Sequence, residues 1–144
     1  MYKITLKAES ESHCGDEEQD YNLCTDSQMR ELDGIDCQDT FSEYFSKGYN
    51  GSIGEQNLIN KGVSGGYMYF KYEDGKLWTI TTYDSKEELT PSELDELVSY
   101  TQGQWSDGIG EGFEQFPCHE DSDGEYFISP WFSGQKVEVK QEKI

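Results

Sequence analysis

Closely spaced acidic residues are the feature of this chain with the clearest chemical potential. Residues 121–125 read Asp-Ser-Asp-Gly-Glu, and alternating acids before a glycine can direct several oxygens at one cation. The calcium-loop pattern fails at its ends, because His119 and Pro130 fall where an acid and a bidentate glutamate are required. We therefore expect an acidic turn and no bound metal. The alternative, a divalent-cation site, would use Asp107, Glu111, Asp121, Asp123 and Glu125.

Cysteines and histidines are the other potential metal ligands. They are Cys14, Cys24, Cys37 and Cys118, with His13 and His119 next to the first and the last of them. No C-x-x-C spacing occurs, so a zinc site held by the four thiolates is a minor alternative. Because the chain opens without a signal-peptide pattern, disulfides are disfavoured, and we expect free, partly buried thiols.

No recognisable catalytic constellation is present in the sequence. The motifs G-x-S-x-G, H-E-x-x-H and G-K-[ST] do not occur, and both histidines lie in polar segments. A pair of catalytic carboxylates needs a defined separation in space, which a sequence with 30 acids does not establish. We expect a protein that is not an enzyme and has no cofactor. An enzyme acting on a small molecule stays as an alternative.

Net charge is the strongest global feature. The 144 residues carry 30 acidic and 11 basic side chains, a net charge of −19. Residues 9–44 hold twelve acids and one base, and residues 84–125 hold thirteen acids and one base. Self-repulsion on this scale weakens a folded state, so either a partner that normally binds phosphates or simple solubility must explain it. Such a surface repels nucleic acid and anionic lipid, so we expect a basic protein partner, no direct nucleic acid and no membrane.

Composition and length favour a single domain over residues 1–144. An aromatic content of 14%, gathered in segments with strand periodicity, argues against disorder despite the acidity. No stretch approaches 18 apolar residues, and the first residues alternate in the manner of a strand. We expect a soluble, cytoplasmic protein.

Residues 104–114 combine three glycines, three acids and two large rings. They predict a tight loop anchored by Trp105 and Phe113, with the acids facing outward, either as a structural turn or as a contact for a partner. The stretch W-S-D-G-x-G-E-G-F-E within them is similar to stretches in short proteins of bacterial mobile elements. In size, charge and this fragment, the chain resembles phage and mobile-element inhibitors of bacterial defence, which include anti-CRISPR and antirestriction proteins.

That resemblance implies an inhibitor that acts in the cytoplasm of a bacterial host cell. It would present acidic, DNA-mimicking surfaces to the basic nucleic-acid channel of a nuclease, either RNA-guided or a restriction enzyme. Carboxylates on a rigid frame would replace phosphates opposite Arg and Lys. The predicted partner-binding residues are Asp16, Glu17, Glu18, Asp20, Glu87, Glu88, Asp95, Glu96, Asp107, Glu111 and Glu114.

Periodicity predicts the frame that positions these acids. We expect an α+β domain, with an antiparallel sheet of two hairpins plus an N-terminal strand, and two or three helices on one face. Residues 2–8 alternate as a strand, residues 9–20 predict a solvated loop, and a short strand follows near residues 21–24. Thr25 or Asp26 caps a helix that ends at residues 33–34, and Asp39 caps a second helix over residues 40–47.

The remaining elements follow from turn and capping signals. Six glycines in residues 48–66 predict an irregular connection with positive φ at several points. Residues 67–72 and 76–83 predict a hairpin around Glu-Asp-Gly, and residues 124–131 and 136–140 predict a second one. Thr90 and Glu93 predict a capping box at the start of a helix that ends at Gly103. The expected inward-facing residues are Leu94, Leu97, Val98 and Thr101 on this helix, and Val137 and Val139 on the last strand.

Overall fold

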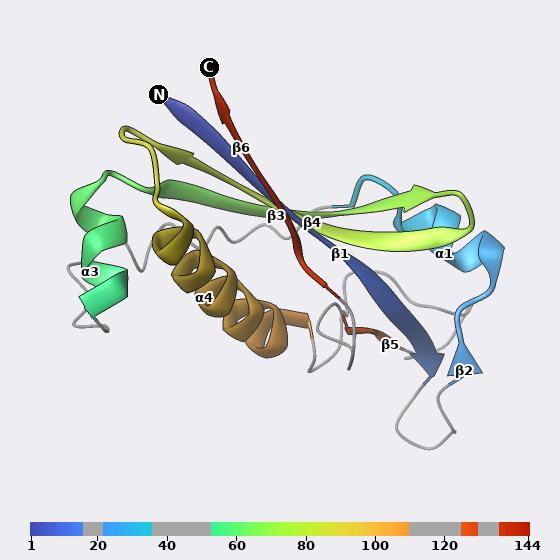
Figure 1. Cartoon of the computed structure of the whole chain (residues 1–144). Helices are drawn as coiled ribbons and strands as arrows, with labels where there is room; N and C mark the ends of the chain where they lie inside the picture. The colour runs from blue at the N-terminus through green and yellow to red at the C-terminus, as the bar shows by residue number, and fades with distance from the viewer. Residues whose placement is uncertain (16–21, 36–52, 110–124, 130–135) are drawn as a thin grey trace.

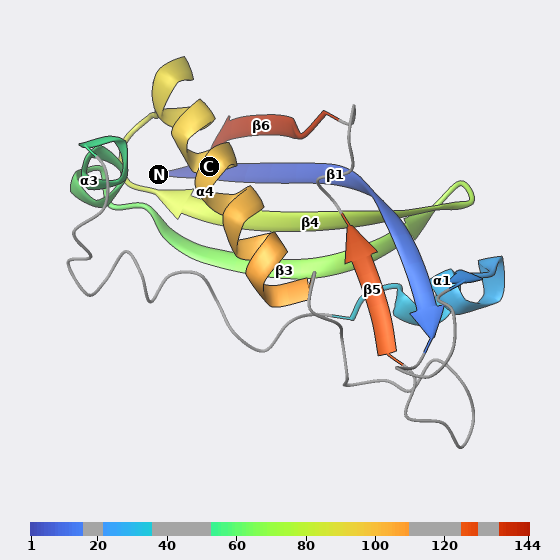
Figure 2. The ribbon, with the colours of Figure 1, turned by 90° about the horizontal axis from the view of Figure 1, so that it is seen from below.

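The computed structural model describes residues 1–15, 22–35, 53–109, 125–129 and 136–144. Within these ranges it contains six strands in one antiparallel sheet and three helices, which confirms the predicted α+β class. Helices α3 (Ile53–Asn60) and α4 (Pro91–Ile109) lie against one face of the sheet (Figures 1 and 2). The helix α1 (Asp26–Leu32) lies near the turn of the hairpin formed by residues 64–85 (Figure 1).

The strand β1 (Tyr2–Gly15) is the centre of the sheet. Ile4, Leu6 and Ala8 are buried on its inner face, as the alternation over residues 2–8 predicts. The strand then continues through residues 9–15, so the predicted loop is wrong for these residues. Alternation persists there with small side chains, because Ser10, Ser12 and Cys14 are buried in place of large apolar residues; residues 16–20 lie outside the described ranges.

Four strands pair with β1 along different parts of its length. Residues 2–10 pair with β4 (Lys76–Ser85), and residues 2–7 also pair with β6 (Glu138–Lys143). Residues 11–15 pair with β5 (Glu125–Ser129), and β2 (Asn22–Leu23) pairs with residues 13–14 near the predicted position.

The arrangement of β5 and β6 differs from the predicted second hairpin. Within the described residues, each pairs with its own half of β1, and no pairing joins β5 to β6. Val139 lies opposite Leu6 at the sheet edge but is 39% exposed, while Val137 is partly buried against the core. A long central strand therefore offers pairing positions that a local turn signal does not reveal.

The strands β3 (Ser64–Glu73) and β4 form the hairpin that the sequence predicts most clearly. Its turn is Asp74-Gly75, with φ of 53° and 77°, which matches the preference of Asp-Gly for hairpin turns with positive φ. The inner side of this hairpin carries Met68, Phe70, Leu77 and Tyr83, all nearly inaccessible to solvent. The hairpin therefore contributes large apolar side chains to the sheet face that α4 covers.

Both predicted capping signals are present at helix starts. Thr25 and Gln28 form a capping box at α1, and Thr90 and Glu93 form one at α4. The prediction that Gly103 ends α4 is wrong, because the helix runs on to Ile109. Burial of Trp105 continues the inward stripe one turn beyond Thr101 and compensates for the poor helix propensity of glycine.

The glycine-rich connection is more regular than its composition suggests. Residues 53–60 form α3, with Leu58 buried, so the expectation of irregular structure is wrong for this part of residues 48–66. Gly62, Gly65 and Gly66 have positive φ, which confirms the backbone conformation predicted for this region. The predicted helix over residues 40–47 lies outside the described residues.

Two hydrogen-bonded aromatic residues fix α4 on the sheet. Trp105 is fully buried, and its indole Nε1–H donates to Thr81 Oγ1 at 2.7 Å. The hydroxyl of Tyr83 lies 2.7 Å from Thr101 Oγ1, and Thr101 in turn donates to the carbonyl of Leu97. Burial raises the pKa of the Tyr83 phenol far above its usual range, so it remains a neutral hydrogen-bonding group. These contacts attach α4 to β4 at two points.

Candidate functional site

The loop between β4 and α4 is held by a dense set of hydrogen bonds. Ser85 Oγ donates to the carbonyl of Glu87 at 2.6 Å, and the backbone N–H of Lys86 donates to the carbonyl of Lys61 at 3.2 Å. The side chain of Leu89 is buried in the core. Hydrogen bonds to its backbone and burial of the Leu89 side chain therefore both hold the loop in place.

Lys61 ties this loop to the first turn of α4. Its Nζ donates to the carbonyl of Glu88 at 3.1 Å and forms an ion pair with the carboxylate of Glu93. The Glu93 side chain is only 11% exposed. Burial opposes its ionisation, but hydrogen bonds from Lys61 and Thr90 outweigh this effect and lower its pKa. Glu93 therefore stays ionised and neutralises Lys61 inside the fold.

Gln141 on β6 connects the last strand to the same loop. Its side-chain amide accepts a hydrogen bond from the N–H of Leu89 at 2.9 Å and donates one to the carbonyl of Leu89 at 3.1 Å. A side-chain amide that bonds both groups of one residue acts as an additional strand partner. The loop is consequently linked to β4, to α4, to β6 and to Lys61, the residue that follows α3.

Four carboxylates project from this fixed frame and form the α4 acidic surface, which we define as Glu87, Glu88, Asp95 and Glu96. All four are exposed, and none forms an ion pair within the described residues. Asp95 and Glu96 lie beside the buried stripe of α4, and Glu87 and Glu88 precede its first residue, Pro91. Glu93 is the acidic residue in the first turn of α4, where the helix dipole favours a negative charge.

Of the predicted partner-binding residues, these four have side chains that the structure describes. Asp107 belongs to α4, but its side chain lies outside the described part. The remaining predicted residues also lie outside it: Asp16, Glu17, Glu18, Asp20, Glu111 and Glu114. Their place relative to the α4 acidic surface stays a prediction.

The predicted tight loop over residues 104–114 requires correction. Residues 104–109 are the last turns of α4, and Trp105 anchors a helix rather than a loop. The indole is fully buried, as predicted, because its spacing from Leu97 and Thr101 continues the helical stripe. Residues 110–114, including Phe113, lie outside the described ranges.

The cysteines depart from the expected free thiols. Cys14 is disulfide-bonded, whereas Cys24 is free. A sulfur in a disulfide is no thiolate ligand, so the zinc site made of four thiolates is excluded in this state. Burial raises the pKa of the Cys24 thiol, which a hydrogen bond with Ser12 only partly offsets, so Cys24 is not an activated nucleophile.

No arrangement for a divalent cation is found within the described residues. Among them, no three His, Cys, Asp or Glu side chains are grouped as metal ligands. Of the residues named for the cation alternative, Asp107 and Glu125 have described backbones, in α4 and β5. The other three lie outside the described ranges.

A pocket of about 290 Å³ opens where β1 passes from β4 to β2 and β5. Glu9 and Glu11 line it, but Glu9 pairs with Lys76 at 3.6 Å and Glu11 with His13 at 3.1 Å. The thiol in its wall is Cys24, whose pKa is raised. The pocket therefore contains no activated nucleophile beside a free base, and it adds no support to the enzyme alternative.

Sequence reasoning missed the residues that fix the α4 acidic surface. Lys61 and Gln141 carry no motif, and they lie 27 and 52 residues from the backbone groups that they bind. The only local signal was the capping box of Thr90 and Glu93, which indicated a well-defined helix start.

In the part of the chain that is described, no helix has the length and apolarity needed to cross a bilayer. Comparison of the chain with family models, with curated proteins and with solved structures finds no match.

Proposed function

We propose that this protein inhibits a nucleic-acid-binding defence protein, an RNA-guided or restriction nuclease, by offering acidic side chains to its basic channel. The observation that carries the proposal is the α4 acidic surface: four exposed carboxylates without ion pairs, on a loop and helix start tied down by Lys61 and Gln141. No catalytic step and no cofactor belong to it.

A fixed backbone makes these carboxylates suited to replace phosphates. Binding loses less conformational entropy when the loop that carries the charges is already ordered. Charge-assisted hydrogen bonds to Arg are short and strong, and a net charge of −19 steers a basic partner toward the molecule. Neutralisation of Lys61 by Glu93 leaves the surface carboxylates free for an external cation.

The compartment requires its own measurement. A bacterial cytoplasm keeps thiols reduced, whereas the disulfide at Cys14 is of the kind that persists in oxidising compartments. Trapping thiols with an alkylating agent in cells that express the protein, followed by mass spectrometry of the Cys14 peptide, decides whether this bond forms where a nuclease acts.

A cleavage assay tests the proposed activity. Purified RNA-guided and restriction nucleases are titrated with the protein, and cleavage of plasmid DNA is followed between 50 and 500 mM salt. We expect inhibition of at least one nuclease and competition with duplex DNA. The affinity should fall steeply with salt, because the Debye length decreases from about 10 Å at 0.1 M to about 3 Å at 1 M.

A charge-matched pair of variants separates the surface from net charge. The test variant is Asp95→Asn and Glu96→Gln, and the control variant is Glu31→Gln and Asp74→Asn, which are exposed and lie outside the α4 acidic surface. Both remove two negative charges, and we expect only the first to weaken inhibition. Equal loss in both would assign the effect to overall charge, and full inhibition by the first would place the contact elsewhere.

A further inference from the structure

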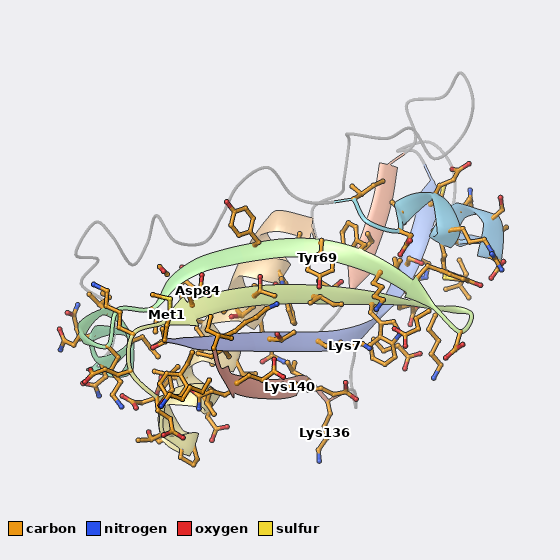
Figure 3. All side chains as sticks on the ribbon, turned by 90° about the horizontal axis from the view of Figure 1, so that it is seen from above. Met1, Lys7, Tyr69, Asp84, Lys136 and Lys140 are labelled. Atoms are coloured by element: carbon orange, nitrogen blue, oxygen red, sulfur yellow. The ribbon has the colours of Figure 1, made fainter. Side chains whose placement is uncertain are left out.

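The sheet face opposite α4 carries no helix within the described part, and its composition differs from the rest of the chain (Figure 3). We call it the open sheet face and define it by the outward residues of β6, β1, β4 and β3. Its charged members are Lys3, Lys7, Lys71, Lys76, Lys140, Glu9, Glu73, Asp84, Glu138 and Glu142. Five lysines against five carboxylates make this face neutral in a chain with a net charge of −19.

Most of the charges on this face form ion pairs with one another. Lys7 and Lys71 lie 3.6 and 3.5 Å from the carboxylate of Glu73. Lys140 lies 2.9 Å from Glu142, two residues further along β6. Figure 3 shows Lys7 and Lys140 on this side of the sheet, together with Tyr69. Interspersed opposite charges of this kind can meet their complements on an identical surface.

Aromatic and apolar side chains fill the positions between the charges. Tyr67 is 58% exposed, whereas Ile80 faces the same side but is only 4% exposed. Tyr69 is paired with Ile80, and Trp78 lies under Lys7, whose Nζ is 4.4 Å from the ring centroid. Tyrosine and tryptophan are the residues that protein interfaces favour at their centres.

We propose that the open sheet face is the contact surface of a homodimer. The net charge repels a second copy, and this repulsion is weakest where the facing surfaces are neutral, as they are on the open sheet face. Nucleic acid is a poorer occupant, because stacking on Trp78 is blocked by Lys7 and the net field is negative. A two-fold axis through this face would leave both α4 acidic surfaces exposed, since α4 lies on the other side (Figure 2).

Area sets the expected strength of this dimer. Four strands spaced about 4.8 Å apart, with up to ten residues rising about 3.3 Å each, give a flat face of roughly 600 Å² per copy. The total of roughly 1,200 Å² is at the lower end of specific interfaces, so we expect a dissociation constant of about micromolar order.

Sedimentation velocity from 1 to 500 µM protein, at 0.1 and 0.5 M NaCl, tests the proposal. We expect a monomer–dimer equilibrium whose affinity rises by roughly tenfold or more with salt, because screening removes repulsion between two highly charged bodies. Nuclease inhibition has the opposite salt dependence, so each proposal can fail without the other. A monomer at every concentration in both salts would overturn the dimer.

Three variants locate the contact. Tyr67→Glu and Thr5→Glu each place a new negative charge on the open sheet face, and we expect either to abolish the dimer. Ser99→Glu adds the same charge to the exposed side of α4 and should leave association within about twofold, a change of about 0.4 kcal/mol. Tyr67 is the most exposed target, so its variant decides the matter if Thr5→Glu does not fold.

Two outcomes contradict this assignment. Equal weakening by Ser99→Glu would mean that any added charge disrupts association. Binding of a fluorescent oligo-dT to the wild-type protein, lost in Tyr67→Glu, would make the open sheet face a nucleic-acid site instead.

Discussion

The two halves of β1 are stabilised in different ways, although they form one continuous strand. Residues 2–8 bury Ile4, Leu6 and Ala8 beneath α4, and this half is paired on both sides by long strands. Residues 10–14 bury Ser10, Ser12 and Cys14 instead. The first half depends on hydrophobic packing, and the second depends on hydrogen bonds and a covalent link.

Small polar residues serve as core residues in the second half because each has a partner. Ser10 Oγ lies 2.7 Å from Thr79 Oγ1, the carbonyl of Ser12 accepts from the N–H of Cys24 at 2.9 Å, and Cys14 is disulfide-bonded. Buried polar groups are tolerated when they are hydrogen-bonded. The difference between the halves shows that burial along a strand can persist after its apolar residues end.

The largest effect is expected from the apolar half. Leu6→Ala should destabilise the fold by about 2–5 kcal/mol, because the removed atoms leave a cavity under α4. Denaturant unfolding monitored by far-ultraviolet circular dichroism measures this change. Thr5→Ala on the outer side of the same strand is the control, and a similar loss there would mean that the packing contrast is wrong.

Removal of the covalent link should have the next largest effect. Cys14→Ser is expected to cost about 2–4 kcal/mol, and reducing agent should lower the melting temperature of the wild-type protein similarly. Cys24→Ser is the matched control, since Cys24 is free and should respond weakly. Insensitivity of the wild-type protein to reduction would show that hydrogen bonds alone hold this half.

The buried hydroxyl pair should give a smaller effect. Ser10→Ala leaves the hydroxyl of Thr79 without this partner in the interior and should cost about 1–3 kcal/mol. Adding Thr79→Val to Ser10→Ala should restore part of this stability, because both polar groups are then absent. A double-mutant cycle by denaturant unfolding measures the coupling, and strictly additive losses would argue against a direct pair.

The smallest effect concerns the titration of Cys24. Burial raises its pKa above the ordinary value of 9.0, so the protonated thiol contributes stability below that pH and loses it as pH rises through the folded pKa. Alkylation of Cys24, followed by peptide mass spectrometry, should therefore begin at higher pH in the native protein than in urea. Identical profiles would show that this half is open to solvent.

Elements with strong local signals could be predicted from the sequence. The Asp74-Gly75 turn and the capping box of Thr90 and Glu93 depend on residues within four positions of each other, so their geometry follows from local rules. The end of α4 could not be predicted in this way. The gain from burying Trp105 beneath the sheet overrides Gly103, and that gain depends on Thr81, which lies 24 residues earlier.

The candidate site likewise combines features that local patterns predict with features that depend on distant residues. Exposure of Asp95 and Glu96 follows from the helix pattern, because they alternate with the buried stripe of α4, whereas Glu87 and Glu88 are polar residues of the loop before the helix. Their fixed presentation depends on Lys61 and Gln141, which single-sequence patterns do not connect to the loop. Charge composition therefore indicated which residues face outward, but not what holds them.

The pairing of β1 with β6 also determines how this chain reaches its fold. Tyr2 pairs with Lys143 and Lys7 with Glu138, so the central strand pairs with residues more than 130 positions further along the chain. Contacts of such long sequence separation require closure of large loops, which slows folding in small proteins. Until that closure, one edge of β1 is an unpaired template for other strands. We therefore expect refolding in milliseconds to seconds or slower, with aggregation of the unpaired intermediate as its competing process.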